Sequence, residues 1–147
     1  MVAEVIIVPL PIAVTADPRS AERARTGRHG EDLAAAYLSD IGWQVLDRNW
    51  RPGRGMRGEL DLIALEATPR SARPVLVVIE VKTRRSLRQG PPAAAVDGRK
   101  LARLRALAAA WAAAHRVAHS WLRIDVISVL LPEEGPAQLR HHRGVGL

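Results

Sequence analysis

Three charged residues interrupt two otherwise apolar segments of this 147-residue sequence. Asp61 stands in the run ELDLIAL, and Glu80 and Lys82 stand in the run VLVVIEVKTRR. A charge in a protein core is costly unless it is paired or binds a metal ion. Two neighbouring carboxylates repel unless they share a proton or a divalent cation. Because carboxylate oxygens are ligands that Mg2+ prefers, the pattern predicts a Mg2+ or Mn2+ site for phosphodiester chemistry.

A simpler interpretation exists for each of the three residues. Side chains alternate along a strand, so Glu80 and Lys82 share one face and could form an ordinary ion pair at an exposed strand end. Asp61 could pair with one of the many basic residues, since Lys and Arg together number 22. The metal interpretation is preferred because the three charges interrupt two predicted core strands in the order Asp, Glu, Lys.

The surrounding segments predict a mixed α/β domain. The elements expected from hydrophobic periodicity and turn residues are a helix over 27–41 with Thr26 as its N-cap, strands over 43–47, 59–65 and 75–81, a helix over 96–116 and a strand over 121–130. The order α-β-β-β-α-β favours a mixed central sheet flanked by helices. A short turn joins the second and third strands, which predicts an antiparallel hairpin that brings Asp61 close to Glu80.

The expected domain spans residues 25–131. Residues 1–24 contain three Pro and show no helical periodicity, so they are interpreted as a poorly ordered leader, and residues 132–147 as a tail. The segment 51–58 and a second segment closed by Pro91 and Pro92 are expected to be loops. The sequence has no Cys, which excludes disulfides and thiolate metal sites. No apolar run reaches the ~18 residues of a membrane span, and a cytoplasmic location is expected.

Further segments, taken in order with the charged residues, resemble a known family. They are Gly27-x-x-Gly30-Glu31, Arg48-Asn49-Trp50-Arg51, Gly58-Glu59-Leu60-Asp61-Leu62-Ile63-Ala64, Glu80-Val81-Lys82-x-Arg84 and Arg123-Ile124-Asp125-Val126. Together they resemble the YraN-like family of uncharacterised bacterial proteins, whose domain is similar to that of archaeal Holliday junction resolvases. The Asp…Glu-x-Lys pattern resembles the core motif of the restriction-endonuclease-like nucleases. The resemblance covers roughly residues 25–130 and implies a restriction-endonuclease-like fold.

The resemblance also adds Glu31 to the candidate site, because a Glu on the first helix completes the acidic cluster of the related resolvases. Helical spacing places Glu31 on one face with Ala34 and Leu38, so it can point inward. The alternative is that Glu31 is only an acidic residue in the first turn, where it favours the helix dipole.

An active site of this kind assigns a role to each residue. Asp61 and Glu80 would hold the metal ion, with the backbone carbonyl of Val81 as a third ligand, and Glu31 would bind the metal or position a metal-bound water. Lys82 would orient the attacking water or stabilise the developing charge. Lys100 would contact phosphate, or it is simply a solvated helix residue.

A net charge of +7 favours a polyanionic partner, although a solvated basic surface would also explain it. Basic residues on segments that flank the site could form a rim for a phosphate backbone. They are Arg48, Arg51, Arg54, Arg57, Arg84 and Arg85. Trp50 could stack on a base or pack in the core. The His residues, including His115, His119, His141 and His142, are assigned no role, and Asp125 is expected to have a structural Arg partner.

The sequence therefore favours a magnesium-dependent nuclease acting on DNA, including branched DNA. One alternative is a nucleic-acid-binding module on the same scaffold, without cleavage. Another is an interaction protein in which the acidic cluster is a relic. The predicted nucleic-acid contacts are Arg51, Arg57, Arg84, Arg85 and Lys100. No membrane association is expected, and a monomer and a homodimer both remain open.

Overall fold

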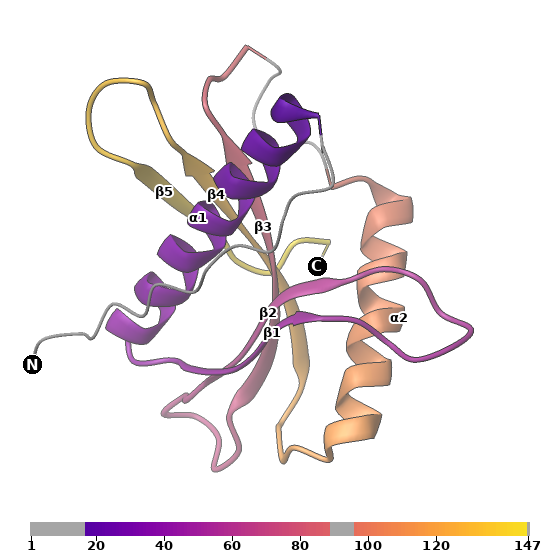
Figure 1. The fold of residues 1–147 in the computed structure, drawn as a ribbon. Helices are drawn as coiled ribbons and strands as arrows, with labels where there is room; N and C mark the ends of the chain where they lie inside the picture. The colour runs from indigo at the N-terminus through magenta and orange to yellow at the C-terminus, as the bar shows by residue number, and fades with distance from the viewer. Residues whose placement is uncertain (1–16, 89–95, 147) are drawn as a thin grey trace, which may run out of the picture.

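The computed structural model describes residues 17–88 and 96–146. The helices and strands are α1 (Pro18–Asp40), β1 (Gln44–Trp50), β2 (Leu60–Glu66), β3 (Val75–Arg84), α2 (Gly98–His115), β4 (Leu122–Leu130) and β5 (Gln138–His142). The strands form one sheet in the order β1-β2-β3-β4-β5, in which β3 and β4 are parallel and the other neighbours are antiparallel. The predicted mixed α/β architecture is confirmed (Figure 1).

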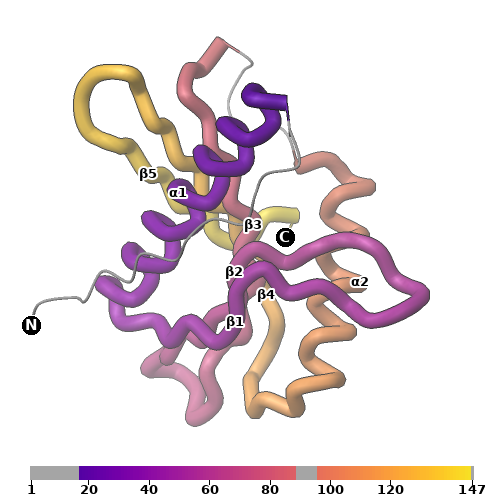
Figure 2. Tube along the Cα trace, in the orientation of Figure 1, coloured from indigo at the N-terminus to yellow at the C-terminus, as the bar shows by residue number. Residues whose placement is uncertain are grey.

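The two helices cover opposite faces of the sheet, as the tube in Figure 2 also shows. One core cluster lies on the α1 face and includes Ala34, Leu38, Leu62, Val77, Ile79 and Ile127. The other lies on the α2 face and includes Leu60, Ile63, Val78, Leu104, Leu107 and Trp111. The first six residues of β3 are buried, in agreement with a strand that is apolar on both faces. Neither α1 nor α2 is long and apolar enough to cross a membrane.

Helix α1 begins earlier than the sequence predicts. The expected start at Gly27 with Thr26 as N-cap is wrong: Asp17 is the N-cap, its side chain accepts a hydrogen bond from the Arg19 amide, and Pro18 occupies the first helical turn. Most side chains of the first two turns are exposed. A helical segment that buries no apolar face has no hydrophobic period to detect. Residues 1–16 of the predicted leader lie outside the described residues, as does the loop at Pro91 and Pro92.

The segment predicted to be an irregular tail contains a fifth strand, so that prediction is wrong. Strand β5 pairs with β4 along its whole length at the edge of the sheet. Its sequence, QLRHH, has one apolar residue, Leu139, and lacks the alternation that marks a half-buried strand. Polar side chains hold it instead: His142 lies 3.2 Å from the hydroxyl of Ser128, and His141 contacts Asp125.

Candidate functional site

Asp61 lies where strands β2 and β3 separate. The predicted antiparallel hairpin is confirmed, and its ladder ends with the pair of Leu62 and Ile79. If the register continued by one position, Asp61 would face Glu80. Instead, the carboxylate of Asp61 accepts a hydrogen bond of 2.8 Å from the backbone N–H of Val81. The carboxylate therefore lies in the opening between the two strands. It accepts the hydrogen bond of the Val81 N–H, which has no backbone partner on β2 beyond the end of the ladder.

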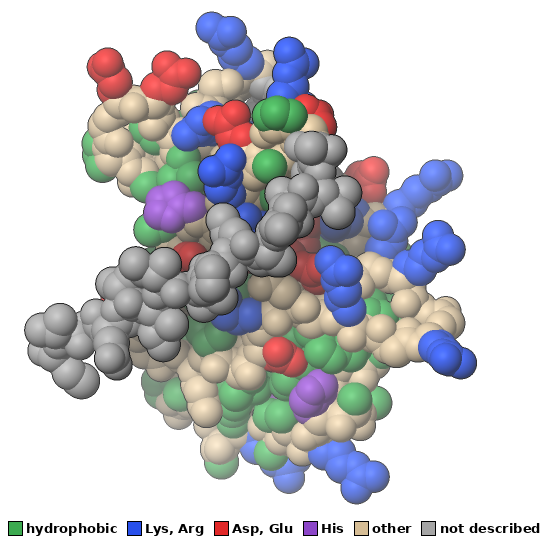
Figure 3. Space-filling model, in the orientation of Figure 1, with side chains coloured by type: hydrophobic (Ala, Val, Ile, Leu, Met, Phe, Trp, Pro, Cys, Tyr) green, Lys and Arg blue, Asp and Glu red, His purple; other side chains and the backbone are tan. Residues whose placement is uncertain are grey.

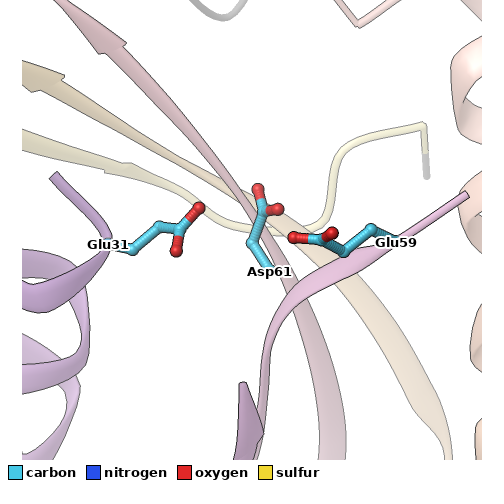
Figure 4. Close-up of side chains that lie close together, drawn as sticks. All are labelled: Glu31, Glu59 and Asp61. Atoms are coloured by element: carbon cyan, nitrogen blue, oxygen red, sulfur yellow. The ribbon is translucent and has the colours of Figure 1, made fainter. Parts of the chain in front are cut away.

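Three carboxylates meet at this opening. One oxygen each from Glu31, Glu59 and Asp61 lies within 4.8 Å of the others. Glu31 approaches from α1, while Glu59 and Asp61 lie two positions apart at the start of β2 (Figure 4). The structure thus brings two of the predicted site residues together and adds Glu59, which the sequence alone did not single out. The available signal was the alternation along the strand, which puts Glu59 and Asp61 on one face.

Asn49 ties the acidic residues of two elements together. Its Nδ2 donates hydrogen bonds to Oε2 of Glu31 at 2.8 Å and to Oε1 of Glu59 at 3.1 Å. Asn49 has a φ of 50°, a left-handed conformation that Asn adopts more readily than most residues. Arg51 adds a contact of 2.7 Å from its Nε to Oε2 of Glu59. The sequence pattern assigns no role to Asn49, although the residue belongs to the RNWR segment.

Glu80 lies beside this cluster and is paired with both lysines of the sequence. The Nζ atoms of Lys82 and Lys100 each lie 3.0 Å from Oε1 of Glu80, whose side chain is only 5% exposed. The ion pair considered for Glu80 and Lys82 is therefore present, but at a buried carboxylate rather than at an exposed strand end. Lys100 is engaged by Glu80, so its contact with phosphate stays a prediction.

The pKa of Asp61 reflects its burial and the negative charge around it. Burial is the largest cause of the rise, followed by the charges of Glu80, Glu31 and Glu59, while the hydrogen bond from the Val81 amide opposes it. Together they raise the pKa of Asp61 to about 7. The two ammonium groups that contact Glu80 do not offset the effect of burial and of the neighbouring carboxylates on the pKa of Asp61. The donor set fits a hard divalent cation, because it offers several carboxylate oxygens at one point.

Two glycines let the backbone approach closely enough to position the carboxylates. Gly30, next to Glu31, packs directly against Thr83 of β3. Gly58, next to Glu59, has a φ of 120°, and a Cβ atom there would stand 2.8 Å from Cδ1 of Leu107. Both positions require the absence of a side chain, and both precede a residue of the acidic cluster.

The arginines of the predicted rim differ in their surroundings. Arg51 is paired with Glu59, and Arg85 is paired with Glu22 at 2.8 Å. Arg84 donates to the carbonyl of Thr83 at 3.2 Å, and Arg57 is exposed. Arg84, Arg85 and Lys82 line a groove that also contains Glu31. Trp50, for which stacking on a base was one interpretation, packs against the α2-side core cluster.

Asp125, a buried residue of β4, is the centre of a separate network. The predicted Arg partner is confirmed: Arg123 donates to both oxygens of Asp125 at 2.8 and 2.9 Å. The view of His141 as incidental is wrong, because its Nε2 lies 2.8 Å from Oδ2 of Asp125 and its ring is 7% exposed. Burial alone would raise the pKa of Asp125, but hydrogen bonds from His141, Arg123 and the Gly144 amide outweigh it and lower the pKa to about 2.

Comparisons with known proteins agree with the resemblance seen in the sequence. The model of the family described as "Uncharacterised protein family UPF0102", to which the YraN-like proteins belong, matches residues 30–129. A UPF0102 protein of Frankia casuarinae is 48% identical over 118 residues, which cover 80% of this chain and 92% of that protein. A UPF0102 protein of an Arthrobacter species is 45% identical over 120 residues, covering 82% and 94%. The chain therefore belongs to the uncharacterised protein family UPF0102.

Proposed function

We propose that this protein is a Mg2+- or Mn2+-dependent phosphodiesterase that hydrolyses DNA. The observation that carries the proposal is the convergence of Glu31, Glu59 and Asp61 at one point, with oxygens within 4.8 Å of one another. Lys82 lies next to the cluster, where a positive side chain suits phosphoryl chemistry. The absence of Cys agrees with the cytoplasmic location that we propose with it.

The residues that would hold the ion are Asp61, Glu31 and Glu80, with the backbone carbonyl of Val81 as a further ligand. Glu59 is a candidate ligand as well, because its carboxylate belongs to the same cluster. When bound, the ion would polarise a phosphate oxygen and lower the pKa of a bound water. Both lysine contacts involve Oε1 of Glu80, so its other carboxylate oxygen would be the one to contribute to the ion site.

The chain's own residues would supply orientation and positive charge. Glu80 holds the ammonium groups of Lys82 and Lys100 at 3.0 Å, which places two cations beside the acidic cluster. Lys82 would stabilise the negative charge that develops on the phosphate. Asn49 would keep the carboxylates of Glu31 and Glu59 in place, since its amide donates to both.

A second candidate function is a nucleic-acid-binding module on the same scaffold. The specific observation in its favour is that Glu80 already has two lysine partners, so its buried charge is compensated without a metal ion. In that case the basic residues would hold the nucleic acid, and Asp61 would be protonated below about pH 7 because of its raised pKa of about 7.

A cleavage assay separates the two functions. Branched, duplex and single-stranded DNA are incubated with wild type, Asp61→Asn and Asp40→Asn in Mg2+, in Mn2+ and in EDTA. Asp40 is the matched control, because it is an exposed carboxylate at the end of α1. The proposal predicts that wild type and Asp40→Asn cleave DNA at similar rates when metal is present. The rate of Asp61→Asn should be lower by roughly 100-fold or more. DNA binding without any metal-dependent cleavage would support the binding module instead.

A further inference from the structure

A groove of about 730 Å³ adjoins the acidic cluster, between the first half of α1 and the end of β3. Its lining includes five basic side chains, Arg19, Arg23, Lys82, Arg84 and Arg85, and two acidic ones, Glu22 and Glu31. In the space-filling view, Lys and Arg side chains lie at the end of the molecule where α1 begins and β3 ends, with Asp and Glu side chains among them (Figure 3). The groove therefore carries an excess of positive charge beside a cluster of opposite sign.

Among the residues that the structure describes, three arginines of the groove have no carboxylate partner. Glu22 is paired with Arg85. Glu31 accepts its hydrogen bond from Asn49 and belongs to the acidic cluster. Within residues 17–88 and 96–146, no carboxylate forms a salt bridge with Arg19, Arg23 or Arg84. These three guanidinium groups are therefore available to an anionic ligand.

The groove-facing residues of α1 form a line that leads to the acidic cluster. Arg19, Arg23, Gly27 and Glu31 follow one another at intervals of four, so they lie on one side of the helix. At a rise of about 1.5 Å per residue, Arg23 stands roughly 12 Å along the axis from Glu31. A Cβ atom at Gly27 would meet nothing within 4 Å, so the space between the arginines and the cluster is open.

We infer that this groove binds the phosphodiester backbone of a DNA duplex on one side of the bond that is cleaved. The inference rests on the proposed function, since a phosphate held at the acidic cluster would place its neighbours along this line of arginines. The described side chains that line the groove include no aromatic ring. Proteins that bind single strands stack bases on aromatic side chains, whereas duplexes are held through their phosphates.

The inference also assigns a role to a segment outside the family match. Arg19 and Arg23 precede residue 30, where the match to the family model begins. They belong to the first turns of α1, whose side chains are mostly exposed and contribute little to the core. The early start of α1 places exposed arginines opposite the end of β3. There they would form one wall of the groove and contact the phosphates of the DNA backbone.

The test is DNA binding measured by fluorescence anisotropy in EDTA, so that no cleavage interferes. A duplex and a single strand of equal length are titrated with wild type, Arg19→Ala with Arg23→Ala, and Arg70→Ala with Arg73→Ala. The last variant is the matched control: it removes the same charge from exposed positions between β2 and β3. Both groove positions are exposed, so the substitutions should leave the fold intact, and circular dichroism of each variant checks this.

We expect wild type to bind duplex more tightly than single strand. The groove variant should bind duplex about tenfold more weakly, because two phosphate contacts are lost. For the same reason, the slope of log K against the logarithm of the salt concentration should be less steep by about 1 to 2. The control should lose less than about threefold, and Arg19→Lys with Arg23→Lys should regain most of the affinity. Equal losses in the groove variant and in the control, or tighter binding of the single strand, would overturn the inference.

The readout separates this inference from the proposed function. One outcome is that the groove variant selectively loses duplex binding while wild type shows no metal-dependent cleavage. This outcome would support DNA binding by the groove and refute the nuclease activity. Metal-dependent cleavage with unchanged duplex binding in the groove variant would support the nuclease and refute the groove.

Discussion

Gly30 of α1 lies so close to Thr83 of β3 that a Cβ atom at position 30 would stand 1.9 Å from Oγ1 of Thr83. The same Cβ atom would also lie 2.8 Å from Cγ2 and 2.9 Å from Cβ of Thr83, so rotation of the Thr side chain cannot relieve the clash. The contact sets the distance between α1 and the sheet, and Glu31 follows directly. The position of this carboxylate over Asp61 therefore depends on a glycine.

The first prediction concerns this contact. Gly30→Ala should lower the free energy of unfolding by about 1–3 kcal/mol, because overpacking forces α1 away from β3. Chemical denaturation measures the change. Gly27→Ala is the control, since a Cβ atom there meets nothing and Ala favours the helix by about 0.5–1 kcal/mol. If Gly30→Ala were as stable as Gly27→Ala, the proposed role of the close approach would be wrong.

The second prediction concerns Asn49. Asn49→Gly keeps the left-handed backbone accessible but removes the amide that donates to Glu31 and Glu59. We expect the affinity for Mn2+ to fall by about tenfold, as is typical when a residue that orients metal ligands is lost. Calorimetric titration measures the affinity, and denaturation checks the fold. Unchanged affinity in a folded variant would show that Asn49 does not position the carboxylates.

The third prediction follows from the pKa of Asp61. This pKa is raised to about 7 in the folded chain, so Asp61 stabilises the fold only while it is protonated, and that contribution is lost as the pH rises through about 7. In EDTA, Asp61→Asn should therefore be more stable than wild type at pH 8, by on the order of 2 kcal/mol, and nearly equal to it below about pH 4, where Asp61 is protonated in both the folded and the unfolded chain. The amide oxygen can still accept from Val81.

Denaturation curves at both pH values test this prediction. An Asp61→Asn variant that loses stability at pH 8 would mean that positive charge compensates the carboxylate in the folded protein, and the raised pKa of Asp61 would then be wrong. Added Mg2+ should raise the stability of wild type at pH 8 more than that of the variant, because the stabilisation by a ligand falls as its affinity falls.

The fourth prediction concerns the network around Asp125. Its pKa is lowered to about 2, so its contribution to stability is present above about pH 4 and is lost as the pH falls through about 2. Asp125→Asn should cost about 3–5 kcal/mol at pH 6, because the buried guanidinium of Arg123 loses its charged partner. The difference from wild type, measured by denaturation, should shrink between about pH 4 and pH 2. A difference that is independent of pH would contradict the assigned ionisation.

The predictable part of the fold is the part that apolar residues specify. The run over 75–81 and the ELDLIAL segment identify β3 and β2, and their connection predicts the hairpin that brings Asp61 near Glu80. Strand β5 escapes prediction because His141 and His142 hold it through polar contacts with Asp125 and Ser128. A hydrophobic pattern carries no information about a segment that is fixed by hydrogen bonds.

The candidate site also divides into residues that the sequence pattern reveals and residues that it does not. Asp61, Glu80 and Lys82 are detectable because charges stand out in apolar strands, and Glu31 enters through resemblance to a family. Glu59 and Asn49 lie at strand ends, where polar residues are ordinary. The alternation that puts Glu59 on one face with Asp61 is the one sequence signal for Glu59, and the sequence has no such signal for Asn49. Only the three-dimensional structure shows that the amide of Asn49 joins Glu31 to Glu59.

Calorimetric titration of Mn2+ at pH 8 is the decisive test of the claim that the carboxylates around Asp61 bind a divalent cation. Wild type and Asp40→Asn should bind one ion per chain with equal affinity, while Asp61→Asn and Glu31→Gln should each bind at least about tenfold more weakly, a loss of about 1.4 kcal/mol or more. Equal Mn2+ affinity in wild type and Asp61→Asn, or no binding by wild type with and without DNA, would contradict the claim.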